Sequence, residues 1–131
     1  MCIRDSLSAR CILVADDDEM ILTVATTALT MHGYTVLKAR DGEEALALYR
    51  AHRHEVSLLL IDDTMPRASG REVIGAIRAE NGTLPIIWTS GSGEPISSDA
   101  SGSPLTRSLP KPYPLTELLK EVRELIGADP G

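Results

Sequence analysis

Residues 11–18 read Cys-Ile-Leu-Val-Ala-Asp-Asp-Asp, an apolar run that ends abruptly in carboxylates. A run that is apolar at every position is typical of a strand buried on both faces, as in a parallel sheet covered by helices. From Met20 onward apolar residues recur at spacings of three and four, which predicts an amphipathic helix that stops at His32-Gly33. The recurring residues are Ile21, Val24, Ala28 and Met31. This stretch therefore predicts one βα unit with acids at the end of its strand.

Apolar runs and helical patterns keep alternating along the rest of the chain. Four further strands are expected, at residues 34–39, 56–61, 85–89 and 106–109. Helices are expected after the turn at Gly42, after Gly70, and over an apolar periodicity that ends at Gly127. This alternation indicates βα units around a five-stranded parallel sheet.

The helical pattern fails between residues 90 and 104. Of these 15 residues, 11 are Ser, Gly or Pro, and only Ile96 is a large aliphatic residue. Such a composition does not support a stable helix. We therefore expect the fourth helix to be short, irregular or mobile.

The length of 131 residues fits a single domain, which we place at residues 10–127. Residues 1–9 fit neither a strand nor a helix period and are expected to be a leader outside the domain, with residues 128–131 as a tail. The net charge is −6, there is no basic run, and no apolar stretch approaches the roughly 20 residues of a membrane span. We therefore expect a cytoplasmic protein with neither nucleic acid nor a membrane as its partner.

Polar residues stand where the expected strands end. They are Asp16 and Asp17 after the first strand, Asp62 after the third, Thr89 and Ser90 after the fourth, and Lys111 after the fifth. In open parallel sheets, ligands bind outside these carboxyl ends. Carboxylates about 4 Å apart repel by roughly 4 kcal/mol per pair at an effective dielectric of 20, so a cation is expected among them. An all-oxygen set suits Mg²⁺ and a lysine suits a phosphate oxygen, which together describe a phosphoryl-handling site with an aspartate as acceptor.

Neighbouring residues have simpler interpretations. Asp18 and Glu19 suit the N-terminus of the following helix, where carboxylates cap backbone N–H groups and complement the helix dipole. Trp88 lies within an expected strand and is predicted to be a core residue rather than a stacking platform. Of the adjacent Asp62 and Asp63, only one can face the site, because successive side chains on a strand point in opposite directions.

Five motifs in order make the chain from Arg10 to Gly127 resemble the receiver domain of two-component response regulators. They are ILVADD at residues 12–17, GYTV at 33–36, ARDGEEAL at 39–46, LLIDDTMP at 59–66 with Gly70 four residues later, and KPY at 111–113. The resemblance implies a flavodoxin-like (βα)5 fold, a three-layer sandwich around a five-stranded parallel sheet. It also implies a signalling switch and not a turnover enzyme, with slow autodephosphorylation as the only hydrolysis.

The resemblance further implies roles for the residues at the strand ends. Asp62 would accept the phosphoryl group as an acyl phosphate, because the family's Met-Pro follows three and four residues after the acceptor. Mg²⁺ would be held by Asp62, directly by Asp17, and mainly through water by Asp16. The backbone carbonyl of Thr64 would complete the protein ligands.

The remaining implied roles concern a lysine and a hydroxyl. Lys111 would pair with the phosphoryl group, and a hydroxyl after the fourth strand would act as the switch. Counting from Pro85, Ser90 fits the switch position better, with Thr89 as the fallback. The family usually has an aromatic residue three positions before the lysine that swings inward on activation. Ser108 stands there, so the aromatic half of the switch is missing.

The implied phosphodonor is a histidine kinase or a histidine phosphotransfer protein. The Ser90-Gly91 pair, the weak fourth helix and residues 109–113 favour a receiver of a bacterial hybrid sensor histidine kinase, or a stand-alone receiver. The alternative is a haloacid-dehalogenase-like phosphatase with Asp16 as nucleophile, whose first motif residues 16–20 nearly match without its terminal Thr. An interaction module that no longer needs phosphate is disfavoured by the intact acids, hydroxyl and lysine.

Overall fold

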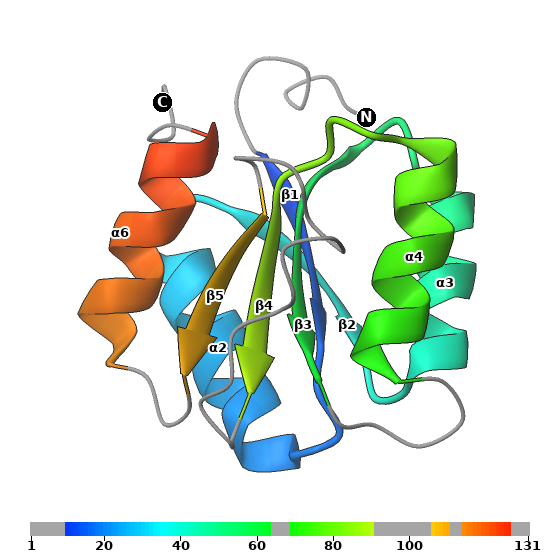
Figure 1. Ribbon diagram of the computed structural model, residues 1–131. Helices are drawn as coiled ribbons and strands as arrows, with labels where there is room; N and C mark the ends of the chain where they lie inside the picture. The colour runs from blue at the N-terminus through cyan, green and yellow to red at the C-terminus, as the bar shows by residue number, and fades with distance from the viewer. Residues whose placement is uncertain (1–9, 64–68, 91–105, 111–113, 127–131) are drawn as a thin grey trace.

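The computed structural model describes residues 10–63, 69–90, 106–110 and 114–126 (Figure 1). Five parallel strands form one sheet in the order β2-β1-β3-β4-β5. The strands are β1 (Cys11–Ala15), β2 (Thr35–Ala39), β3 (Val56–Asp62), β4 (Ile86–Ser90) and β5 (Thr106–Pro110). Each lies within one residue of its predicted limits, so the predicted parallel sheet is confirmed.

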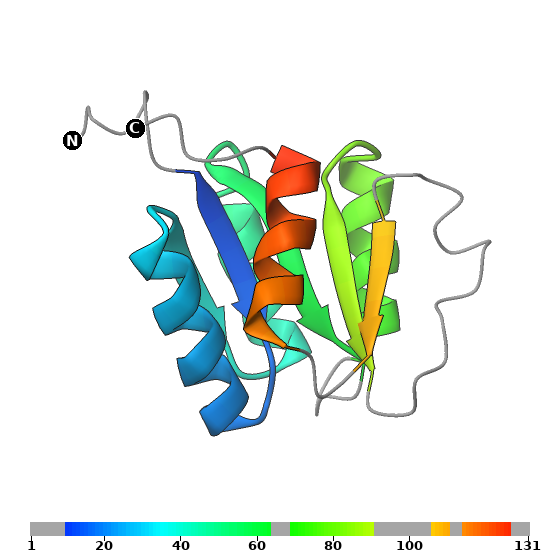
Figure 2. The same cartoon turned by 90° about the vertical axis from the view of Figure 1, so that its left-hand side faces the viewer.

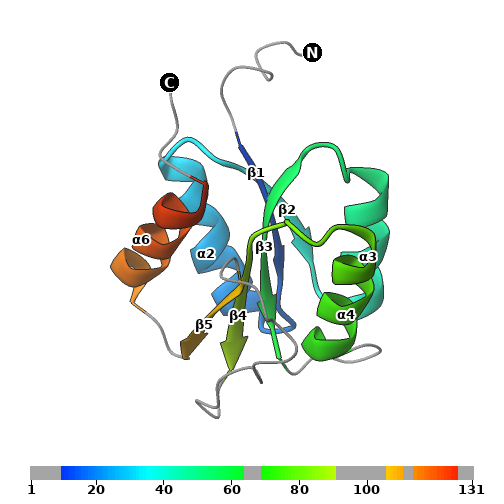
Figure 3. The same ribbon diagram turned by 45° about the horizontal axis from the view of Figure 1, so that its top comes forward.

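Helices cover both faces of the sheet. They are α2 (Glu19–Met31), α3 (Gly42–Ala51), α4 (Gly70–Glu80) and α6 (Leu115–Ile126). Figures 2 and 3 show α2 and α6 on one face and α3 and α4 on the other, which gives the predicted three-layer, flavodoxin-like sandwich. Within the described residues, no helix is both long and apolar enough to cross a membrane. The predictions for the fourth helix, the leader and the tail concern segments outside the described residues.

The central strands are buried on both faces, as their uniform apolarity predicts. In β1, Leu13 packs with the α3 and α4 side of the core, and Ile12 and Val14 pack with the α2 and α6 side. Trp88 is 1% exposed within the cluster under α3 and α4, so its predicted core position is confirmed. The sheet thus separates two apolar layers, both built mainly from aliphatic side chains.

The end of α2 follows the predicted stop. Gly33 has a φ of 92°, a left-handed conformation that favours glycine. The Gly33 N–H donates to the Thr30 carbonyl at 3.1 Å, and the Tyr34 N–H donates to the Leu29 carbonyl at 3.1 Å. These two bonds form a Schellman motif, and the buried side chains of Leu29 and Tyr34 belong to the same cluster. The turn directs the chain from α2 into the neighbouring strand β2.

The buried face of α2 differs from the one that the sequence periodicity indicates. Of the four recurring residues, only Ala28 is buried, whereas Val24 and Met31 are exposed, at 42% and 77%. Met20, at the start of the helix, is exposed as well, at 72%. The residues that face the sheet are Leu22, Ala25, Ala28 and Leu29. The helix carries two apolar stripes, and packing against the sheet and α6, rather than periodicity, selects one of them.

This assignment of the buried face predicts opposite outcomes for two substitutions near the end of α2. Leu29→Ala should lower the free energy of unfolding by about 2–5 kcal/mol, because it leaves a cavity in the core. Met31→Ala should change it by no more than about 0.5 kcal/mol, because that side chain is solvated. Urea denaturation followed by circular dichroism measures both free energies of unfolding. Equal losses in the two variants would contradict this assignment of the buried face.

Candidate functional site

Three carboxylates converge at the carboxyl edge of the sheet. Ala15 on β1 is paired with Ile61 on β3, so the residues that follow them, Asp16 and Asp62, stand at equivalent places on adjacent strands. Carboxylate oxygens of Asp16, Asp17 and Asp62 all lie within 4.8 Å of one another. Asp16 and Asp62 are buried, whereas Asp17 is exposed. The structure therefore brings together the acids that the sequence places after the first and third strands.

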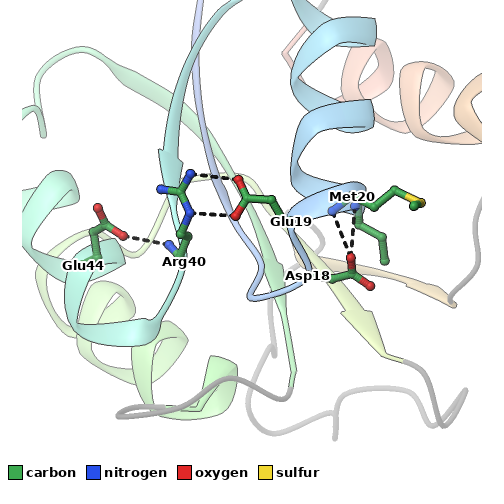
Figure 4. Close-up of polar contacts among 6 residues, drawn as sticks. Asp18, Glu19, Met20, Arg40 and Glu44 are labelled. Carbon is green, nitrogen blue, oxygen red and sulfur yellow. Dashed lines mark hydrogen bonds and ion pairs between the residues drawn. The ribbon is translucent and has the colours of Figure 1, made fainter.

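Hydrogen bonds to the backbone fix the acids after β1. The Asp16 N–H donates to the Ala39 carbonyl at 3.1 Å, which extends the pairing with β2 past the strand end. The Asp16 carboxylate in turn accepts the Asp18 N–H at 2.9 Å. The Asp18 carboxylate accepts the N–H groups of Met20 at 3.0 Å and Ile21 at 3.4 Å (Figure 4). Asp18 is thus the N-cap of α2, which confirms its predicted capping role.

Glu19 has a role that the sequence did not indicate. Its carboxylate accepts two bonds from the Arg40 guanidinium, at 2.9 and 2.8 Å, and the Arg40 backbone N–H donates to Glu44 at 2.8 Å (Figure 4). The hydrogen bonds from Arg40 lower the pKa of Glu19, so its carboxylate keeps its charge to a lower pH than an unpaired glutamate would. The pair ties the first turn of α2 to the segment after β2.

The acids after β3 occupy different positions. Asp62 belongs to the three-carboxylate cluster, whereas Asp63 is absent from that group. The Asp63 backbone instead bridges two elements, because its N–H donates to the Thr89 carbonyl at 2.8 Å and its carbonyl accepts the Gly70 N–H at 2.9 Å. Asp63 therefore links the ends of β3 and β4 to the start of α4.

Gly70 packs directly against the backbone of Asp62. A Cβ atom at Gly70 would overlap the Asp62 carbonyl oxygen, and it would also crowd Asp63. Helix α4 begins at this contact with a capping box, in which Ser69 accepts the Glu72 N–H at 3.2 Å and Glu72 accepts the Ser69 N–H at 3.0 Å. In the sequence Gly70 is only part of a motif; the structure shows that its lack of a side chain allows α4 to abut β3.

The other predicted site residues are described only in part. Thr89 is paired with Asp62 on the adjacent strand, and its buried hydroxyl donates to the Ile61 carbonyl at 3.4 Å. Ser90 is the last residue of β4. Thr64 and Lys111 lie outside the described residues.

The donor set of the cluster suits a hard divalent cation. Three carboxylates within 4.8 Å supply only oxygen ligands, and at such distances they repel one another strongly unless a cation lies among them. Mg²⁺ is commonly bound through one or two carboxylates while it keeps several waters and phosphate oxygens. The exposed Asp17 and the buried pair Asp16 and Asp62 fit such an ion at a site open to solvent on one side.

The fold and this acidic edge define a flavodoxin-like domain with a candidate cation site. A sequence model of the response regulator receiver domain matches residues 12–123, and the chain belongs to this family. Receiver domains are signalling domains rather than dedicated enzymes. The match confirms the predicted family, and it gives no support to the haloacid-dehalogenase-like phosphatase alternative.

Individual relatives agree with this assignment. The chain is 36% identical over 117 residues to "Response regulator MprA" of Mycobacterium ulcerans, covering 88% of this chain and 49% of that protein. It is 36% identical over 116 residues to "Response regulator RR06" of Streptococcus pneumoniae, covering 88% of this chain and 52% of that protein. The chain thus spans about half the length of these curated relatives.

Solved structures show the same fold. The receiver domain of the hybrid histidine kinase CckA has a TM-score of 0.76 at 30% identity, covering 88% of this chain and 98% of that chain. The receiver domain of Francisella response regulator 1452 has a TM-score of 0.77 at 30% identity, covering 89% and 96%. Both similarities extend over nearly the whole of the neighbouring receiver domain.

Two glycines of α4 provide a matched test of the contact with Asp62. Gly70→Ala should lower the free energy of unfolding by about 1–3 kcal/mol, because the methyl group overlaps backbone atoms that cannot easily move. Gly75→Ala should raise it by about 0.4–1 kcal/mol, because a Cβ there has nothing within 4 Å and alanine favours the helix. Urea denaturation of both variants decides the matter, and equal stabilities would argue against the contact.

Proposed function

We propose that this receiver domain accepts a phosphoryl group on Asp62 in a Mg²⁺-dependent step and thereby acts as a signalling switch. The observation that carries the proposal is the position of Asp62. Its carboxylate is buried at the end of a central strand and lies within 4.8 Å of the carboxylate oxygens of Asp16 and Asp17. A nucleophile flanked by two further acids requires a cation to approach a phosphoryl anion, and the cluster has the ligands to hold one.

The transfer is a displacement at phosphorus. An Asp62 carboxylate oxygen forms a bond to the phosphorus of a phosphohistidine as the P–N bond breaks, and the electron pair stays on the imidazole nitrogen. The product is an acyl phosphate, which water later hydrolyses to restore the carboxylate. When bound, Mg²⁺ would neutralise part of the negative charge on the phosphoryl oxygens. Asp17 is the proposed direct ligand, Asp16 acts mainly through water, and the Thr64 carbonyl completes the set.

Two further residues are proposed to contact the phosphoryl group. The Lys111 ammonium pairs with one of its oxygens, as a compact cation suits. Ser90 is the proposed switch hydroxyl. Its neighbour Thr89 already uses its buried hydroxyl for the Ile61 carbonyl, which supports Ser90 over Thr89 for this role.

The proposed phosphodonor is a histidine kinase or a histidine phosphotransfer protein. We place the domain in the bacterial cytoplasm, within a hybrid sensor histidine kinase or as a stand-alone receiver. The receiver domain of a hybrid kinase, which is 30% identical to this chain, is compatible with this context. The net charge of −6 favours a protein partner over nucleic acid as the direct contact of this domain.

The acceptor assignment is tested by incubation with acetyl phosphate or phosphoramidate and Mg²⁺. The protein should gain the mass of one phosphoryl group, and hydroxylamine should remove it, as expected of an acyl phosphate. Asp62→Asn should abolish the gain, because an amide oxygen is a poor nucleophile. Asp63→Asn is the matched control and should retain it. Loss of labelling in Asp63→Asn with labelling kept in Asp62→Asn would move the acceptor to the neighbouring residue.

The cation site is tested by titration calorimetry with Mg²⁺. Asp17→Asn should weaken binding by more than about tenfold, because it removes one negative charge from a proposed direct ligand of a divalent ion, and such an attraction is worth several kcal/mol at an effective dielectric of 20. Asp18→Asn removes a charge one residue away but keeps a side chain that caps α2, so it should bind nearly as tightly as the parent. EDTA should abolish the phosphoryl gain. Equal affinities in the two variants would show that Asp17 is no ligand.

A further inference from the structure

Trp88 carries a buried hydrogen-bond donor. Its side chain is 1% exposed, and its indole Nε1 has no hydrogen-bond partner among the residues that the structure describes. Nearly all buried polar groups in folded proteins are paired, so an orphaned N–H indicates an arrangement that another packing could improve. Trp88 is also the only tryptophan among the 131 residues, which makes its surroundings directly observable.

The face of this indole is covered by a cation. The Arg71 guanidinium carbon lies 5.1 Å from the Trp88 ring centroid, within the range of a cation–π contact. Arg71 is exposed, and none of the residues that the structure describes provides a carboxylate partner for it. It stands in the first turn of α4, where the helix dipole disfavours a positive charge. Among the described residues, the ring is thus the one favourable electrostatic contact of this guanidinium.

Both residues are connected to Asp62 through the backbone. Arg71 follows Gly70, which abuts the Asp62 carbonyl. Trp88 is paired with Ile61, the residue before Asp62, in the register of β3 and β4. Contacts therefore run in a continuous ring: from Asp62 to the start of α4, from Arg71 to the Trp88 indole, and from β4 back to β3. A change at the end of β3 acts on both sides of the contact.

We propose that the Arg71–Trp88 contact is a latch between the start of α4 and strand β4, which holds the unphosphorylated arrangement and loosens when Asp62 carries a phosphoryl group. The proposal rests on the function proposed above. A phosphoryl group on Asp62 changes the strand end against which Gly70 packs, so it displaces the start of α4, and Arg71 with it, from Trp88 on β4. When the guanidinium leaves the ring, the indole can turn towards an acceptor for its N–H. Arg71 is in this sense a positioning residue.

Linkage fixes the sign of the expected effect. If the contact stabilises the unloaded state, then removing it must favour the loaded state by the same factor. An exposed cation–π contact accounts for about a 2- to 5-fold change in an equilibrium constant. Arg71→Met keeps the length of the side chain without its charge and should therefore raise the affinity for beryllofluoride, a phosphoryl mimic, by about 2- to 5-fold. Arg71→Lys keeps a cation and should give a smaller increase.

The experiment measures beryllofluoride affinity by calorimetry in the presence of Mg²⁺. Arg123→Met is the matched control, because it removes the same charge from an exposed position on α6, on the opposite face of the sheet. Circular dichroism establishes that each variant is folded. Emission and acrylamide quenching of Trp88 in the parent protein should change on loading, and Asp62→Asn should abolish that change.

The outcomes separate the latch from the proposed function. A phosphoryl mass gain on Asp62 with unchanged Trp88 emission and quenching would overturn the latch and leave the acceptor role intact. Equal beryllofluoride affinities in Arg71→Met and Arg123→Met would also overturn it. No phosphoryl gain in the parent protein would overturn the acceptor role and the latch with it. A raised affinity in Arg71→Met alone, with a Trp88 response to loading, supports the latch.

Discussion

Mutual repulsion among three carboxylates is the constraint on which the rest of the structure depends. Oxygens of Asp16, Asp17 and Asp62 lie within 4.8 Å of one another, and two of the three side chains are buried. Two unit charges about 4 Å apart repel by roughly 4 kcal/mol at an effective dielectric of 20, which is large against a total stability of about 5–15 kcal/mol for a typical domain. Only a rigid framework can hold the acids at this distance. The register of β1 and β3 and the packing of α4 on β3 supply it.

The acidic residues next to the cluster make other contacts. Of the 19 acidic residues, six stand at the two strand ends, so the remaining 13 balance the 13 basic residues. Asp18 caps α2, Glu19 is paired with Arg40, and Asp63 bridges two elements through its backbone. The excess of six charges is therefore concentrated at the two strand ends, where three of the six carboxylates can share a cation. The net charge of −6 reflects a local site more than a property of the surface.

The strands and the acidic cluster could be predicted because their information is local. A uniformly apolar run specifies a buried strand wherever it lies, and parallel strand ends must meet at one edge. The buried face of α2 could not be predicted, because Leu29 and Met31 are both apolar and only the packing of the helix decides between them. The Glu19–Arg40 pair joins residues 21 positions apart, and it requires β2 to lie beside β1. Such contacts follow from the topology and not from spacing.

The topology also brings the starts of two helices, one on each face of the sheet, against the same cluster. The chain leaves β1 for α2 and β2 on one side, and β3 lies on the other side of β1, so the strand order reverses between β1 and β3. Asp16 contacts the start of α2 through the Asp18 N–H, whereas Asp62 contacts the start of α4 at Gly70. These two helices cover opposite faces (Figure 3). We therefore expect a charge added to one carboxylate at this crevice to act on both helix starts, so that one covalent event would alter surfaces on opposite faces of the sheet.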